Sequence, residues 1–190
     1  MNAAHLHVIL NHIPVIGVPI GFALLIYGLL RKSTEVLRAA LLLLVAMGIV
    51  AIPTFLSGQA AEDIVEHLPG VGHDVIENHE GAATIAFAVT LALGTVALGA
   101  LLWSFRSGTV GVPLVIVLLL FSGGVSGWLA RTANLGGQIR HTEFQPGGSE
   151  GAEAEEEREE ADGEEAERHP RDERDERGDR RGRNRRRRGR

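Results

Sequence analysis

Four long apolar runs constrain this sequence more than any other feature. They cover residues 13–30, 39–56, 82–105 and 110–130, and none contains an Asp, Glu, Lys or Arg. A helix needs about 20 apolar residues to cross the hydrocarbon core of a bilayer, so each run is a candidate membrane span. Four spans in series with short connections predict an all-α fold, an up-down-up-down bundle of four transmembrane helices.

The chain changes character after residue 148. Residues 1–148 hold the four runs and only six Lys or Arg and eight Asp or Glu side chains. Residues 149–190 hold thirteen Arg and sixteen Asp or Glu side chains and no aromatic residue. A segment with so little apolar surface cannot bury enough of it to fold. The sequence therefore predicts a four-helix membrane domain over residues 1–148 and a disordered, acidic and then Arg-rich tail over residues 149–190.

The absence of cysteine limits the chemistry. The chain contains none, which excludes disulfides, thiolate metal ligands, covalent c-type haem attachment and iron–sulfur ligation by this chain. A metal or cofactor would have to be held by histidine, carboxylate, methionine or backbone oxygen.

The positive charges of the membrane domain indicate its orientation. Arg31, Lys32 and Arg38 fall between the first two runs, and Arg106 falls between the last two. The segment before the first run and the connection 57–81 contain no Lys or Arg. Because cytoplasmic connections carry the excess of Lys and Arg, both termini are predicted to be extracytoplasmic.

The histidines then gather on one side of the membrane. Seven of the eight lie before the first run, between the second and third, or after the fourth: His5, His7, His12, His67, His73, His79 and His141. In an up-down-up-down bundle these three segments share one face, the predicted extracytoplasmic one. The connection 57–81 adds six carboxylates to the same face. This face is therefore the candidate functional site.

Two kinds of ligand set are open, because neutral imidazole binds haem iron as well as copper, iron and zinc ions. His12 and His79 are expected to head the first and third helices and to point into the bundle. One or two b-type haems would use pairs from His5, His12, His67, His73, His79 and His141. A mixed metal centre would use His12, His73, His79, Glu62, Glu66, Glu77 and Glu80. In a third alternative the histidines only titrate or relay protons, in a non-catalytic scaffold subunit.

Three segments of the sequence form a recognisable set: LHVILNHIPVIG before and within the first run, HE at 79–80, and SGWLARTANLGGQIRHTE from residue 126. Together they resemble a bacterial family of four-helix inner-membrane proteins of unknown function. Members are sometimes fused to, or encoded beside, Rieske iron–sulfur and cytochrome proteins. The resemblance thus implies a bacterial plasma-membrane location and electron transfer beside other respiratory or redox subunits. The chain departs from the family pattern by inserting ARTAN before Gly136.

These observations together predict an electron-transfer or accessory membrane subunit rather than a stand-alone enzyme. It would carry haem b or a metal ion on its extracytoplasmic face. Its partners would be the lipid bilayer and redox subunits, and the Arg-rich end of the tail could bind anionic lipid or an acidic partner. Nucleic acid is not an expected partner, because the chain has no base-reading motif.

Overall fold

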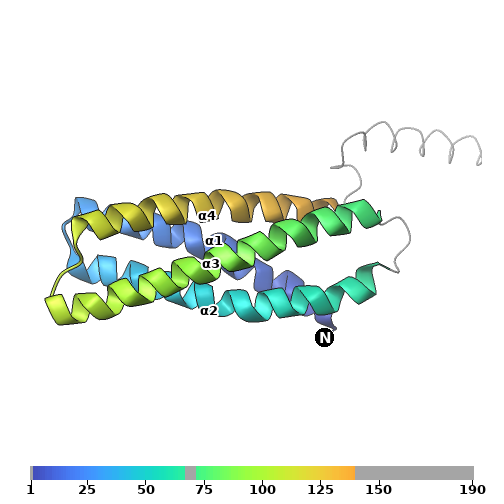
Figure 1. Cartoon of the computed structure of the whole chain (residues 1–190), viewed down its shortest axis with the longest axis horizontal. Helices are drawn as coiled ribbons and strands as arrows, with labels where there is room; N and C mark the ends of the chain where they lie inside the picture. The colour runs from blue at the N-terminus through green and yellow to red at the C-terminus, as the bar shows by residue number, and fades with distance from the viewer. Residues whose placement is uncertain (1, 67–71, 140–190) are drawn as a thin grey trace, which may run out of the picture. The chain divides into compact units, whose positions relative to one another are not determined.

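A computed structural model describes residues 2–66 and 72–139, which form four α-helices (Figure 1). Their bounds are α1 Ala3–Leu30, α2 Thr34–Val65, α3 His73–Ser107 and α4 Val112–Gln138. All four are long and apolar enough to cross a membrane, and the described residues contain no strand. The predicted all-α bundle of a multi-pass membrane protein is confirmed. The predicted tail lies outside the described residues.

The helices pack in chain order around a square. Helices α1 and α3 each pack against both α2 and α4, so α1 and α3 face each other along a diagonal. Figure 1 shows the four helices running side by side, with the α1–α2 and α3–α4 connections at one end. We call this the connection end. The opposite end holds the starts of α1 and α3 and the final turns of α2 and α4, and we call it the histidine end.

The helices extend beyond the apolar runs, mostly at the histidine end. Helix α1 begins at Ala3, where the Asn2 side chain caps it by accepting a hydrogen bond from the backbone N–H of His5. His12 was expected to head this helix but lies in its third turn, and His79 lies in the second turn of α3. A helix can continue past the hydrocarbon core because its backbone N–H and carbonyl groups bond to each other within the helix. The apolar runs therefore gave only lower limits on the lengths of the helices.

Leucines fill the middle of the bundle, and apolar side chains also cover its outside. Leu25, Leu44, Leu93 and Leu118 are at most 1% exposed. Leu120, in contrast, is 76% exposed. Large exposed apolar side chains occur on all four helices, which suits a surface that faces lipid.

Helices α2 and α3 approach most closely at a pair of glycines. A Cβ atom placed on Gly94 would lie 2.9 Å from the Cα atom of Gly48. Only glycine lets two helix backbones come into such direct contact. This contact holds the two helical hairpins, α1–α2 and α3–α4, against each other near the middle of the bundle.

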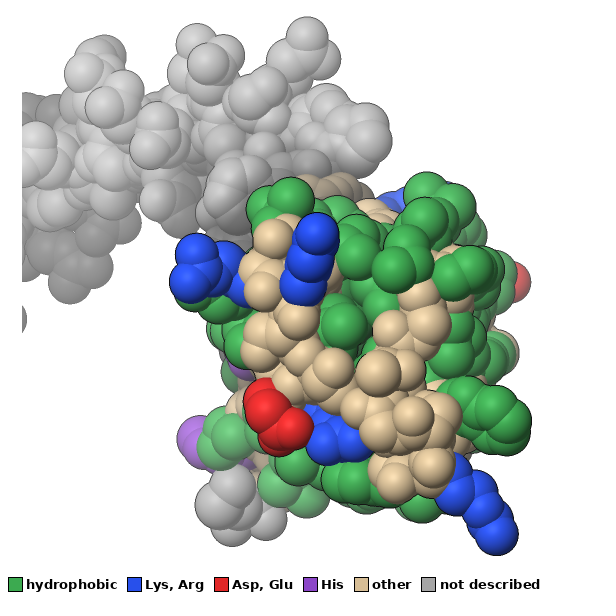
Figure 2. All heavy atoms as spheres, turned by 90° about the vertical axis from the view of Figure 1, so that its left-hand side faces the viewer, with side chains coloured by type: hydrophobic (Ala, Val, Ile, Leu, Met, Phe, Trp, Pro, Cys, Tyr) green, Lys and Arg blue, Asp and Glu red, His purple; other side chains and the backbone are tan. Residues whose placement is uncertain are grey.

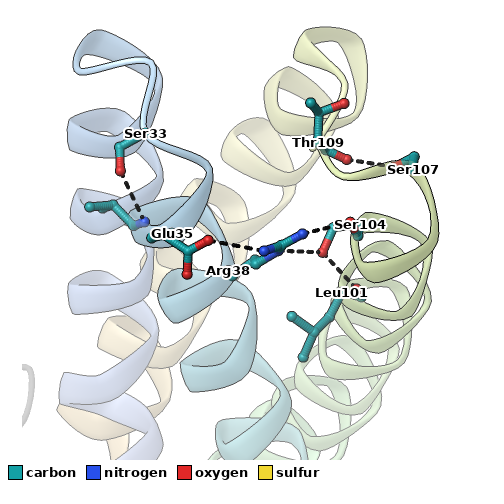
Figure 3. Close-up of polar contacts among 8 residues, drawn as sticks. Ser33, Glu35, Arg38, Leu101, Ser104, Ser107 and Thr109 are labelled. Atoms are coloured by element: carbon teal, nitrogen blue, oxygen red, sulfur yellow. Dashed lines mark hydrogen bonds and ion pairs between the residues drawn. The ribbon is translucent and has the colours of Figure 1, made fainter.

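Arg38 ties α2 to α3 at the connection end (Figure 3). Its guanidinium donates hydrogen bonds to the hydroxyl and carbonyl oxygens of Ser104, at 3.2 and 2.8 Å, and to Glu35 at 3.0 Å. It also lies 4.9 Å from the ring centroid of Phe105. Figure 2 views this end directly and shows Lys and Arg side chains around its rim. The Lys and Arg residues at this end are those from which the positive-inside rule predicts the cytoplasmic side.

Candidate functional site

Two histidines meet at the histidine end, one from each of two diagonally opposed helices. The ring centroids of His7 on α1 and His79 on α3 are 6.4 Å apart, with the ring planes at 78°. Both side chains are half-buried. Since α1 and α3 are not neighbours in the square, the two rings approach each other across the bundle rather than along a shared helix face.

Each ring is held by a hydrogen bond to the backbone of the next helix. His7 Nδ1 lies 3.0 Å from the carbonyl oxygen of Thr54 on α2, and His79 Nδ1 lies 3.1 Å from that of Thr132 on α4. A carbonyl oxygen can only accept, so Nδ1 carries the hydrogen in both rings. The lone pair of each neutral imidazole is then on Nε2. Neither Nε2 atom has a hydrogen-bond partner within residues 2–66 and 72–139.

A glycine makes room for each ring. A Cβ atom on Gly58 of α2 would lie 2.9 Å from Cε1 of His7, and one on Gly136 of α4 would lie 2.9 Å from Cε1 of His79. Real Cβ atoms do not approach other carbons so closely. Each histidine therefore packs directly on a helix backbone that must lack a side chain at that point.

The two hairpins repeat one arrangement. In each, a histidine on the first helix donates to a threonine carbonyl on the second, and the contacting glycine follows that threonine by four residues. The hydroxyls of Thr54 and Thr132 both donate to the carbonyl oxygen of the residue four positions earlier, at 2.8 and 3.0 Å. Both also lie 3.4 Å from the carbonyl oxygen of the residue three positions after the histidine, Leu10 or Ala82. The paired rings are thus two copies of one local structure.

The surroundings of the pair are small side chains. Buried residues on the flanking turns of α2, α3 and α4 are Ser57, Ala61, Ile76, Ala82, Ala86, Leu129 and Thr132. All but two of these are Ala, Ser or Thr, whereas leucine dominates the middle of the bundle. Small residues let the helix backbones approach closely around the two rings.

The other candidate histidines lie elsewhere. His5 and His12 are exposed, and His12 Nδ1 bonds to the carbonyl oxygen of Val8 in its own helix. His73 is exposed too, with Nδ1 3.7 Å from a carboxylate oxygen of Glu66. His67 and His141 lie outside the described residues.

Of the carboxylates proposed for a mixed metal centre, Glu66 contacts His73, and Glu62 lies within electrostatic range of Glu66, Glu80 and His73. Glu62 is half-buried, whereas Glu66, Glu77 and Glu80 are exposed. In the part of the chain that the structure describes, no group of three or more His, Asp and Glu side chains is placed to hold a metal ion. Among the histidines of residues 2–66 and 72–139, the two whose rings come together are His7 and His79.

Comparisons with known proteins add no homologue. No protein-family model, curated protein or solved structure matches the chain. The resemblance to the four-helix inner-membrane family stays a prediction, and the function has to be argued from the His7–His79 pair itself.

His7 was the one member of this pair left out of the predicted ligand sets. The pattern Thr-x-x-x-Gly occurs four times in the sequence, at 54–58, 90–94, 95–99 and 132–136. Only the copies at 54–58 and 132–136 lie on a helix that follows one with a histidine near its start. The pattern alone therefore does not single out His7, and its pairing with His79 follows from the structure.

Proposed function

We propose that this membrane protein binds a b-type haem through His7 and His79 and carries electrons. The observation that supports it is the pair of imidazoles with both Nδ1 atoms bonded to backbone carbonyls and both Nε2 lone pairs available. Iron-ligating histidines usually donate their second ring nitrogen to a carbonyl or carboxylate, which fixes the tautomer and makes the imidazole a stronger donor. Both rings meet this condition.

The separation of the rings suits a shared metal atom. A point midway between them is 3.2 Å from each centroid, half of 6.4 Å. A nitrogen at the edge of an imidazole ring lies roughly 1.1 Å from the ring centre, which leaves about 2.1 Å, close to the metal–nitrogen bond of about 2.0–2.1 Å. A shared metal atom at this midpoint would need both Nε2 atoms turned toward it, along the line that joins the two centroids.

The number of donors favours haem over a bare ion. A structural zinc ion takes four ligands, and a catalytic one takes three from protein. Within the described residues only two donors come together, and no third His, Asp or Glu joins them. Haem iron already has four porphyrin nitrogens, so two imidazoles complete its coordination.

Two protein ligands would leave haem iron no free coordination position, which favours electron transfer over oxygen chemistry. The chain's own residues would hold the iron, orient both imidazoles and exclude water with the surrounding apolar helices. The predicted orientation puts this site at the extracytoplasmic face of a bacterial plasma membrane. Electron exchange with other redox subunits of a respiratory assembly, as the family resemblance implies, is part of the same proposal.

The test is a reduced-minus-oxidised visible spectrum of the full chain, purified in detergent after expression with excess haem. Sharp bands of low-spin haem b are expected from the parent protein. They should disappear in His7→Ala and in His79→Ala. His12→Ala is the matched control, because His12 is exposed on the same helix as His7 and should keep the full spectrum.

Two results would overturn the proposal. One is a flat spectrum from folded parent protein supplied with haem. The other is a spectrum that His12→Ala removes and His7→Ala leaves intact. Metal analysis on the same samples distinguishes the alternatives, since copper, iron or zinc bound in whole-number ratio without haem bands would favour a bare ion. No metal and no haem would favour a scaffold subunit.

A further inference from the structure

An open groove runs along the outside of the bundle between α3 and α4, on the lipid-facing side of the turns that carry His79. It has a volume of about 660 Å³. Its lining residues are Asp74, Glu77, Asn78, Gly81, Ala82, Ile85, Trp128 and Arg131. The lining includes neither His7 nor His79, although Ala82 belongs both to the groove and to the turns that flank the pair.

Charges of both signs border the groove without pairing with each other. Asp74, Glu77 and Arg131 are all exposed. Among the described residues the ion pairs are Arg38–Glu35 and His73–Glu66, and none of these three side chains takes part in one. The Arg131 guanidinium instead lies 4.9 Å from the ring centroid of Trp128. A ligand carrying both an anionic and a cationic group would satisfy all three charges.

The groove changes from polar to apolar along α3. Asp74 lies in the first turn, and Ile85 lies eleven residues further on, about 16 Å along the helix axis at 1.5 Å per residue. Gly81 between them leaves open space, since a Cβ atom there would meet nothing within 4 Å. The indole nitrogen of Trp128 is already bonded to the carbonyl oxygen of Ala82 at 3.0 Å, so the ring is fixed as a wall. A groove of this form suits an amphiphile with its head near Asp74.

We propose that the groove binds a zwitterionic phospholipid whose head group ends in a primary ammonium. Arg131 binds the phosphate, Asp74 and Glu77 accept hydrogen bonds from the ammonium, and one acyl chain lies past Gly81 toward Ile85. A quaternary ammonium has no N–H to donate and would rely on an aromatic face. Arg131 already occupies a face of Trp128, so the groove discriminates against choline.

This proposal is independent of haem and has its own reporter. The chain has two tryptophans, and Trp103 is 64% exposed at the connection end of the bundle. The variant Trp103→Phe therefore leaves Trp128, in the groove wall, as the sole tryptophan. The probes are short-chain phosphatidylethanolamine, phosphatidylcholine and phosphatidylglycerol, each titrated into the full chain in detergent while tryptophan fluorescence is followed.

Saturable binding of phosphatidylethanolamine is expected. Its half-saturation concentration should be about tenfold below that of phosphatidylcholine or phosphatidylglycerol, because only its ammonium group can donate charge-assisted hydrogen bonds to Asp74 and Glu77. Arg131→Gln should raise the half-saturation concentration for every phosphate lipid. Glu77→Gln should weaken only phosphatidylethanolamine binding and so remove the preference. Arg106→Gln, an exposed arginine at the other end, is the matched control and should change nothing.

Equal half-saturation for the three lipids in the parent protein would overturn the proposal, and so would a preference for phosphatidylglycerol. An Arg131→Gln protein with unchanged half-saturation and normal helical circular dichroism would refute the phosphate contact. Native mass spectrometry gives a second readout, in which the parent protein should retain more phosphatidylethanolamine than Glu77→Gln does.

Discussion

Replacing Gly136 with alanine tests the packing of His79 directly. The added Cβ atom would lie 2.9 Å from Cε1 of the His79 ring, which is too close. The ring cannot move away freely, because its Nδ1 atom is bonded to the carbonyl oxygen of Thr132. The neighbouring Gly137 offers a matched control, since a Cβ atom there would meet nothing within 4 Å.

The expected magnitude follows from the difference between the two variants. Alanine gains about 0.5–1 kcal/mol over glycine in a helix, and this gain largely cancels because both sites lie at the end of α4. Overpacking at Gly136 costs about 1–3 kcal/mol, which includes weakening the His79 hydrogen bond. Gly136→Ala should therefore be about 1–3 kcal/mol less stable to unfolding than Gly137→Ala.

The assay is equilibrium unfolding in mixed detergent micelles, followed by helical circular dichroism on samples of equal cofactor content. A double-mutant cycle isolates the contact, because His79→Ala removes the ring that clashes. In the His79→Ala background the two alanine variants should differ by less than about 0.5 kcal/mol. The reasoning is refuted if the full difference persists in that background, or if Gly137→Ala costs as much as Gly136→Ala.

Two further predictions concern the rest of the bundle. Arg38→Ala should lower the free energy of unfolding by about 2 kcal/mol, because it removes the bonds from α2 to α3. Arg106→Ala, at an exposed position near the same end, should stay within about 0.5 kcal/mol of the parent. Gly94→Ala should cost about 1–3 kcal/mol, since its Cβ atom would meet the Gly48 backbone. Gly99→Ala should be neutral or stabilising, because a Cβ atom there would meet nothing within 4 Å. Chemical unfolding of all four variants measures these changes in the free energy of unfolding.

The fold could be predicted because the thickness of the hydrocarbon core sets the number of apolar residues that a spanning helix needs, and each of the four runs has about that number. The helix ends could not be predicted in this way. Helix α3 begins at His73, nine residues before the apolar run at 82–105, because a polar helical turn outside the hydrocarbon needs only its own backbone bonds. The residues that hold the candidate site lie in these polar extensions, where hydropathy carries no signal.

Helix rotation explains why the expected histidines diverge. At about 100° per residue, His12 is turned by about 140° from His7 around the axis of α1, so the two cannot face the same way. His7 contacts α2, and His12 is accordingly exposed. His5 is turned by about 200° from His7 and is exposed too. The sequence could place all three near one membrane face, but only the packing of α1 against α2 decides which one points inward.

The repeated arrangement in the two hairpins bears on whether the pair has a purely structural role. A single histidine bonded to a carbonyl would be adequately explained as a half-buried polar group that has found one partner. Here the same bond, the same threonine and the same glycine occur twice, and both rings meet across the diagonal with their second nitrogens unbonded to the described residues. Neither Nε2 atom is among the buried side-chain atoms that lack a partner, so water can reach both nitrogens and the repeat itself is the argument for a ligand. A ligand that needs two equivalent donors on opposite sides accounts for the repeat, the glycines and the open nitrogens together.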